Sequence, residues 1–164
     1  MKTLLIGRHA KSDRYLGLGM RDRDRTLNER GNRDAPKLGQ ALKNYEFMPD
    51  RVISSPAIRA FETARIVTSN AGFVGEIQTD ERIYTGGLPG ILSCLQETEP
   101  EINHLACFGH NPTVSELIQY FARMDVEPKT PTGTLALIQF HTVSWEQIGK
   151  CRAELIFLLI PKLI

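Results

Sequence analysis

The chain has 164 residues, of which 41% are hydrophobic and 24% charged, and its formal net charge is +1. These values are ordinary for a globular protein and predict a single domain over residues 1–164 with a hydrophobic core of its own. They exclude a general attraction to nucleic acid or to an anionic membrane, so an anionic ligand must be bound by a local cluster of cations.

The sequence also indicates where the protein resides. No segment approaches the roughly 20 apolar residues that a membrane helix needs. The start of the chain does not resemble a secretory signal, because Arg8 and His9 interrupt its apolar run. Its three cysteines are an odd number without a C-x-x-C pair, which argues against a disulfide framework and against a zinc site. We therefore expect a cytoplasmic protein with reduced thiols.

In chain order, the first predicted element is an apolar strand at residues 3–7, which ends in Arg8 and His9. The segment TLNE at 26–29 has the form of a helix capping box, and apolar residues follow it at helical spacing from Ala35 to Tyr45. Because proline fits best in the first turn of a helix, Pro36 places the start of the main helix near Asp34.

The next elements alternate between strand and helix. Residues 51–54 form a strand, and Ser55 and Pro56 have the pattern of a helix N-cap followed by proline. After that helix, which ends at 70–72, we predict a strand near 76–79 and a helix near 88–97. Residues 105–108 form another strand, and Asn111 and Pro112 repeat the cap-and-proline pattern before a helix with an apolar stripe. Strands at 134–141 and 152–160 end the sequence and are predicted to pair as a hairpin.

This alternation predicts an α/β fold with a parallel sheet at its centre and an antiparallel edge. In such sheets ligands bind beyond the carboxyl ends of the strands. Three predicted strands, about fifty residues apart in the chain, are followed by polar residues: the first by Arg8 and His9, the second by Arg59, and the third by His110 and Asn111. We therefore expect two arginines and two histidines to surround one point.

Such a cluster favours phosphoryl transfer. The guanidinium group matches phosphate oxygens with two donors at once, and helix N-termini add backbone N–H groups. A neutral imidazole is an established covalent nucleophile, and nearby guanidinium groups help to keep it neutral. Each residue alone has a plainer interpretation: Arg59 as a solvated side chain, Asn111 as a helix cap, and either histidine as a structural residue. Their joint position at one sheet edge favours the site.

Four segments, GRHAKS, RTLNERG, SSPAIRAFETA and GHNP, resemble the histidine phosphatase (phosphoglycerate mutase-like) superfamily, and in particular its short bacterial SixA-type phosphohistidine phosphatases. The resemblance implies a three-layer α/β/α sandwich around a mixed, mostly parallel six-stranded sheet with an antiparallel edge. It implies His9 as the nucleophile of a covalent phosphohistidine intermediate, with Arg8 and Arg59 as a phosphate clamp and His110 as a second catalytic histidine. It implies no metal and no organic cofactor. We also expect Ser12 and Asn111 to contact the substrate.

One departure from the superfamily pattern concerns the substrate. Many members carry a general-acid carboxylate at a position that corresponds to the neighbourhood of Thr85, and here Asp80 and Glu81 only precede it. An alkoxide leaves poorly without a proton, whereas imidazole, with a conjugate-acid pKa of about 6.5, leaves readily. The departure favours phosphohistidine on a partner protein, such as a histidine-containing phosphotransfer domain or a phosphocarrier. The loop from Asp13 to Arg25 is either a rim for that partner or an ordinary solvated loop.

Several alternatives stay open at this point. The same superfamily contains small-molecule phosphomonoester phosphatases, and the scaffold also suits a non-catalytic module that binds phosphate. The segment DRDRT at 22–26 imitates the D-x-D-x-T signature of magnesium-dependent phosphatases, but no apolar strand precedes it. A cysteine phosphatase needs C-x5-R, and the residue six positions after Cys107 is Thr113.

Overall fold

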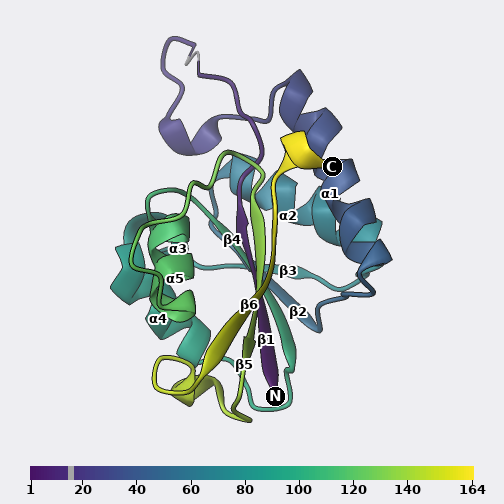
Figure 1. Cartoon of the computed structure of the whole chain (residues 1–164). Helices are drawn as coiled ribbons and strands as arrows, with labels where there is room; N and C mark the ends of the chain where they lie inside the picture. Colours follow the sequence, from purple (N-terminus) through teal and green to yellow (C-terminus); the bar gives the residue numbers. More distant parts are fainter. Residues whose placement is uncertain (15–16) are drawn as a thin grey trace.

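The computed structural model describes residues 1–14 and 17–164. Its centre is a six-stranded sheet with the strand order β3-β2-β4-β1-β5-β6 (Figure 1). The first four strands in this order run parallel, whereas β5 is antiparallel to β1 and β6 is antiparallel to β5. In chain order the strands are β1 (Lys2–Arg8), β2 (Arg51–Ser54), β3 (Ile77–Thr79), β4 (His104–Gly109), β5 (Leu135–Phe140) and β6 (Ala153–Leu159).

Helices cover both faces of the sheet (Figure 1). On one face α1 (Glu29–Asn44) and α2 (Ile58–Ala71) pack against each other. The other face carries the short α3 (Arg82–Thr85), α4 (Gly87–Gln96) and α5 (Thr113–Ala122). Three 3-10 turns complete the described elements: η1 (Asp22–Asp24), η2 (Trp145–Gln147) and η3 (Pro161–Leu163). The expected three-layer α/β/α sandwich with a mixed sheet is confirmed.

The apolar character of β1 follows from its central position. Side chains alternate between the two faces of a strand. Leu4 and Ile6 therefore pack into the core under α4 and α5, while Leu5 packs into the core under α1 and α2. All three side chains are fully buried. A strand that is covered on both faces has a continuous run of apolar residues. Polar residues begin only where the chain leaves the sheet.

The start of α1 differs from the prediction. The helix begins at Glu29 rather than near Asp34, and its N-cap is Asn28, whose side chain accepts the N–H of Gly31 at 3.0 Å. Pro36 lies inside the helix, where it removes one intrahelical hydrogen bond. The helix tolerates this loss because packing of an apolar face supplies most of the stability of a protein helix. The apolar face of α1 packs against α2 and the sheet.

The two cap-and-proline predictions were also wrong. The N-cap of α2 is Ala57 and that of α5 is Pro112, and neither position makes a side-chain capping bond. The Asn111 side chain bonds instead to a partner distant in the sequence, and the Ser55 hydroxyl bonds both to the nearby N–H of Ala57 and to a distant partner, as described below. The four-residue α3 was not predicted. Within residues 1–14 and 17–164, no helix is both long enough and apolar enough to cross a bilayer.

Candidate active site

Two histidines meet where neighbouring parallel strands end. β1 and β4 pair in a register that places Arg8 opposite Gly109, and the N–H of His9 donates to the carbonyl of Gly109 at 3.0 Å. His9 and His110 therefore follow adjacent strands at the same level, and their ring centroids are 5.3 Å apart. This is the upper end of the sheet in Figure 1, opposite the N-terminus of the chain.

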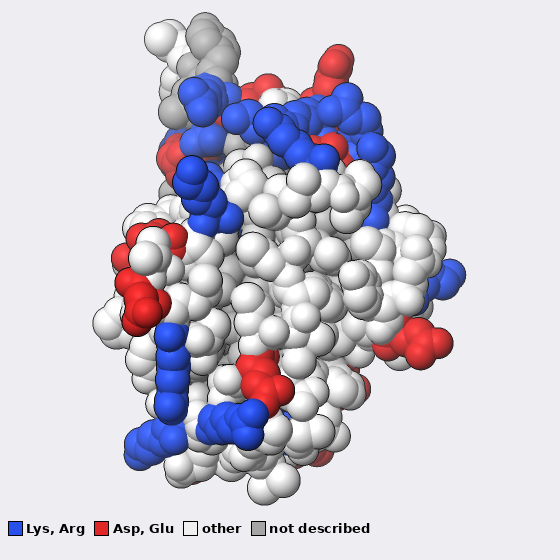
Figure 2. Space-filling view, in the orientation of Figure 1, with Lys and Arg blue, Asp and Glu red and all other residues white. Residues whose placement is uncertain are grey.

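A cavity of about 230 Å³ opens at this point. All six residues that the sequence predicted for the site line it: Arg8, His9, Ser12, Arg59, His110 and Asn111. Its other described lining residues are Lys11, Arg14, Arg25 and Thr132. Five of these ten residues carry a guanidinium or ammonium group and none carries a carboxylate. Figure 2 shows Lys and Arg side chains gathered over the same end of the molecule, above a largely uncharged face.

His9 is held as a neutral imidazole with one defined tautomer. Its Nδ1 lies 2.7 Å from the carbonyl oxygen of Ala10, and because a carbonyl only accepts, Nδ1 carries the proton. The lone pair is therefore on Nε2. Burial lowers the pKa of His9 to about 4, and the positive charges of Arg59 and Arg8 act in the same direction. The side chain thus has the protonation state that a nucleophile requires at neutral pH.

His110 is held by its opposite ring nitrogen. Its Nε2 lies 2.8 Å from the hydroxyl oxygen of Ser55, which also accepts the N–H of Ala57 at 3.2 Å. If the hydroxyl donates to Nε2, the imidazole proton resides on Nδ1. Burial lowers the pKa of His110 to about 3, and the charges of His9 and Arg59 contribute. Ser55, which the sequence pattern had indicated as a helix cap, therefore belongs to the site.

The two arginines are fixed by groups outside the cavity. Arg8 donates from one terminal nitrogen to the carbonyl of Thr130 at 2.7 Å. Arg59 donates to the backbone carbonyl of Asp22 at 2.8 Å and to its carboxylate at 3.0 Å. The Asn111 side chain donates to the hydroxyl of Thr130 at 2.9 Å, so Asn111 supports the same segment that holds Arg8.

Three buried nitrogens in the described residues have no hydrogen-bond partner: Arg8 Nε, Arg59 Nε and His110 Nδ1. Buried polar atoms in native proteins are normally paired, so a cluster of unpaired ones points to a ligand. All three belong to residues that line the cavity. Two are N–H donors on cations, and the third, on the second histidine, is also a donor when Ser55 donates to Nε2; donors of this kind suit a tetrahedral oxyanion.

Ser12 lies at the cavity wall, but its hydroxyl oxygen accepts from a terminal nitrogen of Arg25 at 2.7 Å. Asn111 is engaged by Thr130 through both its amide nitrogen and its carbonyl oxygen. The structure therefore places both side chains beside the cavity, with their polar atoms bonded to the protein. Substrate contact by Ser12 and Asn111 stays a prediction.

The segment near Thr85 contributes an aromatic side chain to the site. Tyr84 packs against His110 with ring centroids 5.4 Å apart, and its hydroxyl donates to the Asp22 carboxylate at 2.8 Å. Asp80 is paired with Arg82 at 2.7 Å, and Glu81 is paired with Arg23 at 3.1 Å. Neither carboxylate lines the cavity.

The segment that imitates D-x-D-x-T forms the 3-10 turn η1. Asp22 is bound by Arg59 and Arg25, and Asp24 is bound by Arg21 at 2.8 Å. Both carboxylates are therefore engaged by arginines, and Asp22 contacts Arg59, which the sequence predicted to bind phosphate. The sequence offered no signal for the roles of Asp22 and Tyr84, because their partners lie 37 and 62 residues away.

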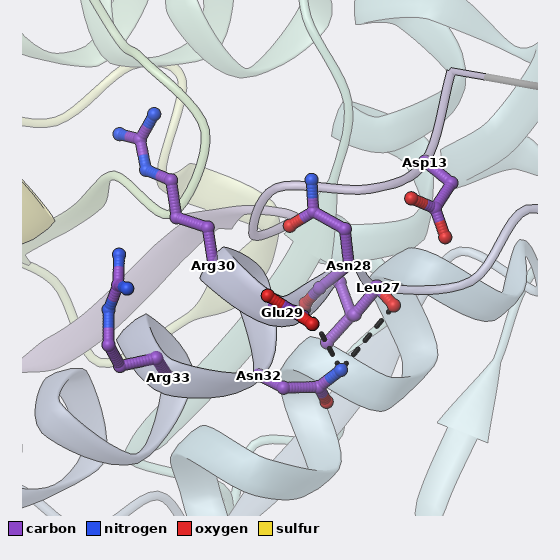
Figure 3. Close-up of a pocket in the computed structure, with 7 residues that line it drawn as sticks. All are labelled: Asp13, Leu27, Asn28, Glu29, Arg30, Asn32 and Arg33. Carbon is purple, nitrogen blue, oxygen red and sulfur yellow. Dashed lines mark hydrogen bonds between the residues drawn. The ribbon is translucent and has the colours of Figure 1, made fainter.

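A larger cavity of about 990 Å³ lies beside the start of α1 (Figure 3). It is lined by Asp13, Leu27, Asn28, Glu29, Arg30, Asn32 and Arg33. In Figure 3 the Asn32 side chain turns back toward the backbone, and its amide donates to the carbonyl of Asn28 at 3.1 Å. The described lining contains no histidine, so this cavity lacks the imidazole groups that line the smaller one.

Comparisons with known proteins identify the family. The family model of the histidine phosphatase superfamily (branch 1) matches residues 4–84, which include His9 and Arg59. An uncharacterized chloroplastic protein of Arabidopsis thaliana is 29% identical over 162 residues, which cover 89% of this chain and 70% of that protein. An uncharacterized protein of Mycobacterium leprae is 26% identical over 94% of this chain and 99% of its own length.

Solved structures share the fold over nearly the whole chain. A protein of Agrobacterium tumefaciens that is assigned to the SixA phosphohistidine phosphatases is 25% identical, with a TM-score of 0.83 and 98% of both chains covered. The protein histidine phosphatase SixA in complex with tungstate is 18% identical, with a TM-score of 0.84 and the same coverage. With the sequence match and the shared fold, the chain belongs to the histidine phosphatase superfamily and is similar to its SixA-type branch.

Proposed function

We propose that this protein is a phosphohistidine phosphatase in which His9 forms a covalent phosphoenzyme. Membership of the superfamily and the phosphatases among its structural neighbours support phosphatase activity. The observation that carries the proposal is the position of His9: a buried, neutral imidazole whose Nδ1 is bonded to Ala10, in a cavity with three unpaired nitrogens. A binding site alone would not require a nucleophile in that protonation state.

The proposed reaction has two steps. In the first, the Nε2 lone pair of His9 attacks phosphorus, the P–N bond of the substrate breaks, and the departing imidazole takes its bonding electrons and a proton. Arg8 and Arg59 hold the phosphoryl oxygens, as preformed donors aimed at developing charge. In the second step water attacks the phosphorus and the bond to His9 breaks, with its electrons returning to Nε2; one proton of the water stays on the released phosphate and the other goes to solvent. The Ala10 carbonyl, as acceptor for Nδ1–H, stabilises the phosphorylated imidazole.

The leaving group is proposed to be an imidazole. The described cavity lining contains no carboxylate, and Asp80 and Glu81 are held by arginines elsewhere. A phosphate ester needs a proton donor for its strongly basic alkoxide, whereas a phosphorylated imidazole ring can take a proton from solvent and then leave as neutral imidazole, a weak base whose conjugate acid has a pKa of about 6.5. The chemistry therefore favours phosphohistidine over esters.

The substrate is proposed to be a phosphorylated protein, such as a histidine-containing phosphotransfer domain or a phosphocarrier. The cations Lys11, Arg14 and Arg25 line the cavity around the buried clamp and suit an anionic side chain presented from outside. We propose the loop from Asp13 to Arg25 as the rim for this partner. Residues 15 and 16 of the loop lie outside the described residues.

The test compares hydrolysis of a phosphohistidine-containing protein with hydrolysis of a panel of phosphate esters, with and without a chelator. We expect preference for phosphohistidine, no effect of the chelator, and acid-labile, base-stable phosphate on His9, which His110→Ala prolongs. A preference for esters would instead identify a small-molecule phosphatase. Binding of inorganic phosphate with no turnover of any substrate would identify a non-catalytic module.

A further inference from the structure

We propose that Asp22 and Tyr84 are positioning residues that hold Arg59 in the orientation that binds the phosphoryl group. The inference rests on the proposed function, because it assigns Arg59 to the phosphate clamp. The three side chains come from three separate elements: Asp22 from η1, Arg59 from α2 and Tyr84 from α3. Their hydrogen bonds join these elements next to Arg59, which lines the cavity.

Asp22 fixes two of the three guanidinium nitrogens of Arg59. Its backbone carbonyl and its carboxylate accept from different terminal nitrogens, at 2.8 and 3.0 Å. Two bonds to one planar group define its plane as well as its position. The third nitrogen, Nε, is buried and unpaired, and Arg59 lines the cavity. Asp22 therefore turns a long, flexible side chain into a preformed donor, which lowers the entropic cost of binding an oxyanion.

Tyr84 fixes Asp22 in turn. Its hydroxyl donates to Asp22 Oδ2, the same oxygen that accepts from Arg59. The Tyr84 ring packs against His110, so the orientation of Asp22 is tied to the second histidine. Arg25 donates to the other carboxylate oxygen at 2.9 Å. Both oxygens of Asp22 are thereby held, and the carboxylate has little freedom to move away from Arg59.

The charge of Asp22 makes the inference testable. Although burial raises its pKa, the hydrogen bonds from Tyr84 and Arg59 lower it to about 2, so Asp22 is an anion at neutral pH. An anion beside a phosphate site repels the ligand. If Asp22 acted only through its charge, its neutralisation would tighten oxyanion binding. If it positions Arg59, neutralisation weakens binding despite the removal of a negative charge.

The experiment measures tungstate affinity by calorimetry, together with kcat/KM, for Asp22→Asn, Tyr84→Phe and Asp24→Asn. Asp24 is the matched control, because it lies in the same turn and, among residues 1–14 and 17–164, its carboxylate pairs only with Arg21. We expect roughly tenfold weaker tungstate binding for Asp22→Asn, the equivalent of one lost charge-assisted hydrogen bond, and a smaller loss for Tyr84→Phe. Asp24→Asn should bind tungstate like the unmodified protein.

A double-mutant cycle separates positioning from a general structural role. In an Arg59→Ala background, Asp22→Asn should weaken tungstate binding no further, because the group that it positions is gone. Additive losses, or tighter binding by Asp22→Asn, would overturn the inference. Because tungstate binding needs no turnover, the cycle can be completed even if the protein fails to hydrolyse phosphohistidine. Failure of the proposed function can therefore be distinguished from failure of the positioning role of Asp22 and Tyr84.

Discussion

The imidazoles of His9 and His110 lie 5.3 Å apart, and each has a different ring nitrogen bonded to a protein oxygen. In His9 the bonded nitrogen is Nδ1, which faces the Ala10 carbonyl, and in His110 it is Nε2, which faces the Ser55 hydroxyl. The nitrogens that remain for a ligand are therefore Nε2 of His9 and Nδ1 of His110. This complementarity is the basis for assigning attack to His9 and hydrogen-bond donation to His110.

Replacement of the proposed nucleophile should abolish turnover without removing the anion site. We expect His9→Asn to show no measurable hydrolysis of phosphohistidine and no phosphoenzyme, while it still binds tungstate through Arg8 and Arg59. His104→Asn is the control, since His104 is an exposed histidine at the opposite end of β4. Near-normal turnover by His9→Asn in a stopped-flow assay would contradict the assignment.

Removal of one clamp arginine should slow the reaction strongly. Arg59→Ala should lower kcat/KM by roughly 10²–10³-fold, the usual consequence of losing one donor that stabilises developing charge. Arg65→Ala is a matched control, because Arg65 lies on the same helix α2, is exposed, and pairs with Glu62 at 2.7 Å. Equal losses in the two variants, measured under the same conditions, would show that the effect is not specific to the clamp.

The sequence predicted which residues meet at one edge of the sheet where a residue's position follows from the sheet. Arg8 ends β1, and His9 and His110 directly follow β1 and β4; residues at the ends of neighbouring parallel strands lie at the same edge of the sheet. The alternation of strands and helices, including the strand at Arg51–Ser54, was also predicted correctly, because it follows from the pattern of apolar residues. These features depend on periodicity, which a single sequence contains.

The sequence predicted side-chain partners poorly. Ser55 and Asn111 precede prolines and helices, a local pattern that indicates caps. Yet Asn111 bonds to Thr130, 19 residues away, and the Ser55 hydroxyl, besides accepting the nearby N–H of Ala57, bonds to His110, 55 residues away. A serine or asparagine can bond a nearby backbone N–H or a distant group with similar energy. Only the tertiary arrangement decides between the two, and the same applies to the bond between Tyr84 and Asp22.

The Ser55 hydroxyl should control the tautomer of His110. Ser55→Ala removes the group at Nε2, so the imidazole proton should distribute between both nitrogens, and kcat should fall by about tenfold, as expected for one lost hydrogen bond of about 1.4 kcal/mol. Nitrogen-15 NMR of His110 reports the tautomer directly. Ser54→Ala is the control, because the Ser54 hydroxyl is buried nearby but donates to the Ser55 carbonyl. An unchanged His110 tautomer in Ser55→Ala would refute this role.

The two histidines should make folding stability depend on pH below neutrality. Their folded-state pKa values, about 4 for His9 and about 3 for His110, lie below the ordinary 6.5. Above pH 6.5 both are neutral in the folded and unfolded states, so their contribution is constant. As the pH falls from 6.5 toward 4, only the unfolded chain takes up these protons, and the free energy of unfolding decreases.

The expected decrease between pH 7 and pH 5 is a few kcal/mol in total, since each histidine contributes at most about 1.4 kcal/mol per pH unit. Urea unfolding at both pH values measures it. The variant His9→Asn/His110→Asn should lose most of the difference, because asparagine does not titrate. A variant that keeps the full pH dependence would show that other groups are responsible.

Gly31, in the NERG segment, should be essential for holding the loop after His9. A Cβ atom at this position would lie 2.1 Å from the carbonyl oxygen of Lys11, which also accepts the N–H of Asn28 at 3.0 Å. Alanine stabilises a helix by about 1 kcal/mol relative to glycine, but here the methyl group must push the backbone of Lys11 away from α1.

His9 lies two residues before Lys11, and misplacement of a reacting group by about 1 Å costs about 100-fold in rate. Gly31→Ala should therefore lower kcat/KM as well as the melting temperature. Gly17→Ala should change neither quantity, because a Cβ at this position meets no atom of the described, non-adjacent residues within 4 Å. If Gly31→Ala melts at a higher temperature and keeps full activity, helix propensity outweighs the contact with Lys11, and the contact does not position the catalytic loop.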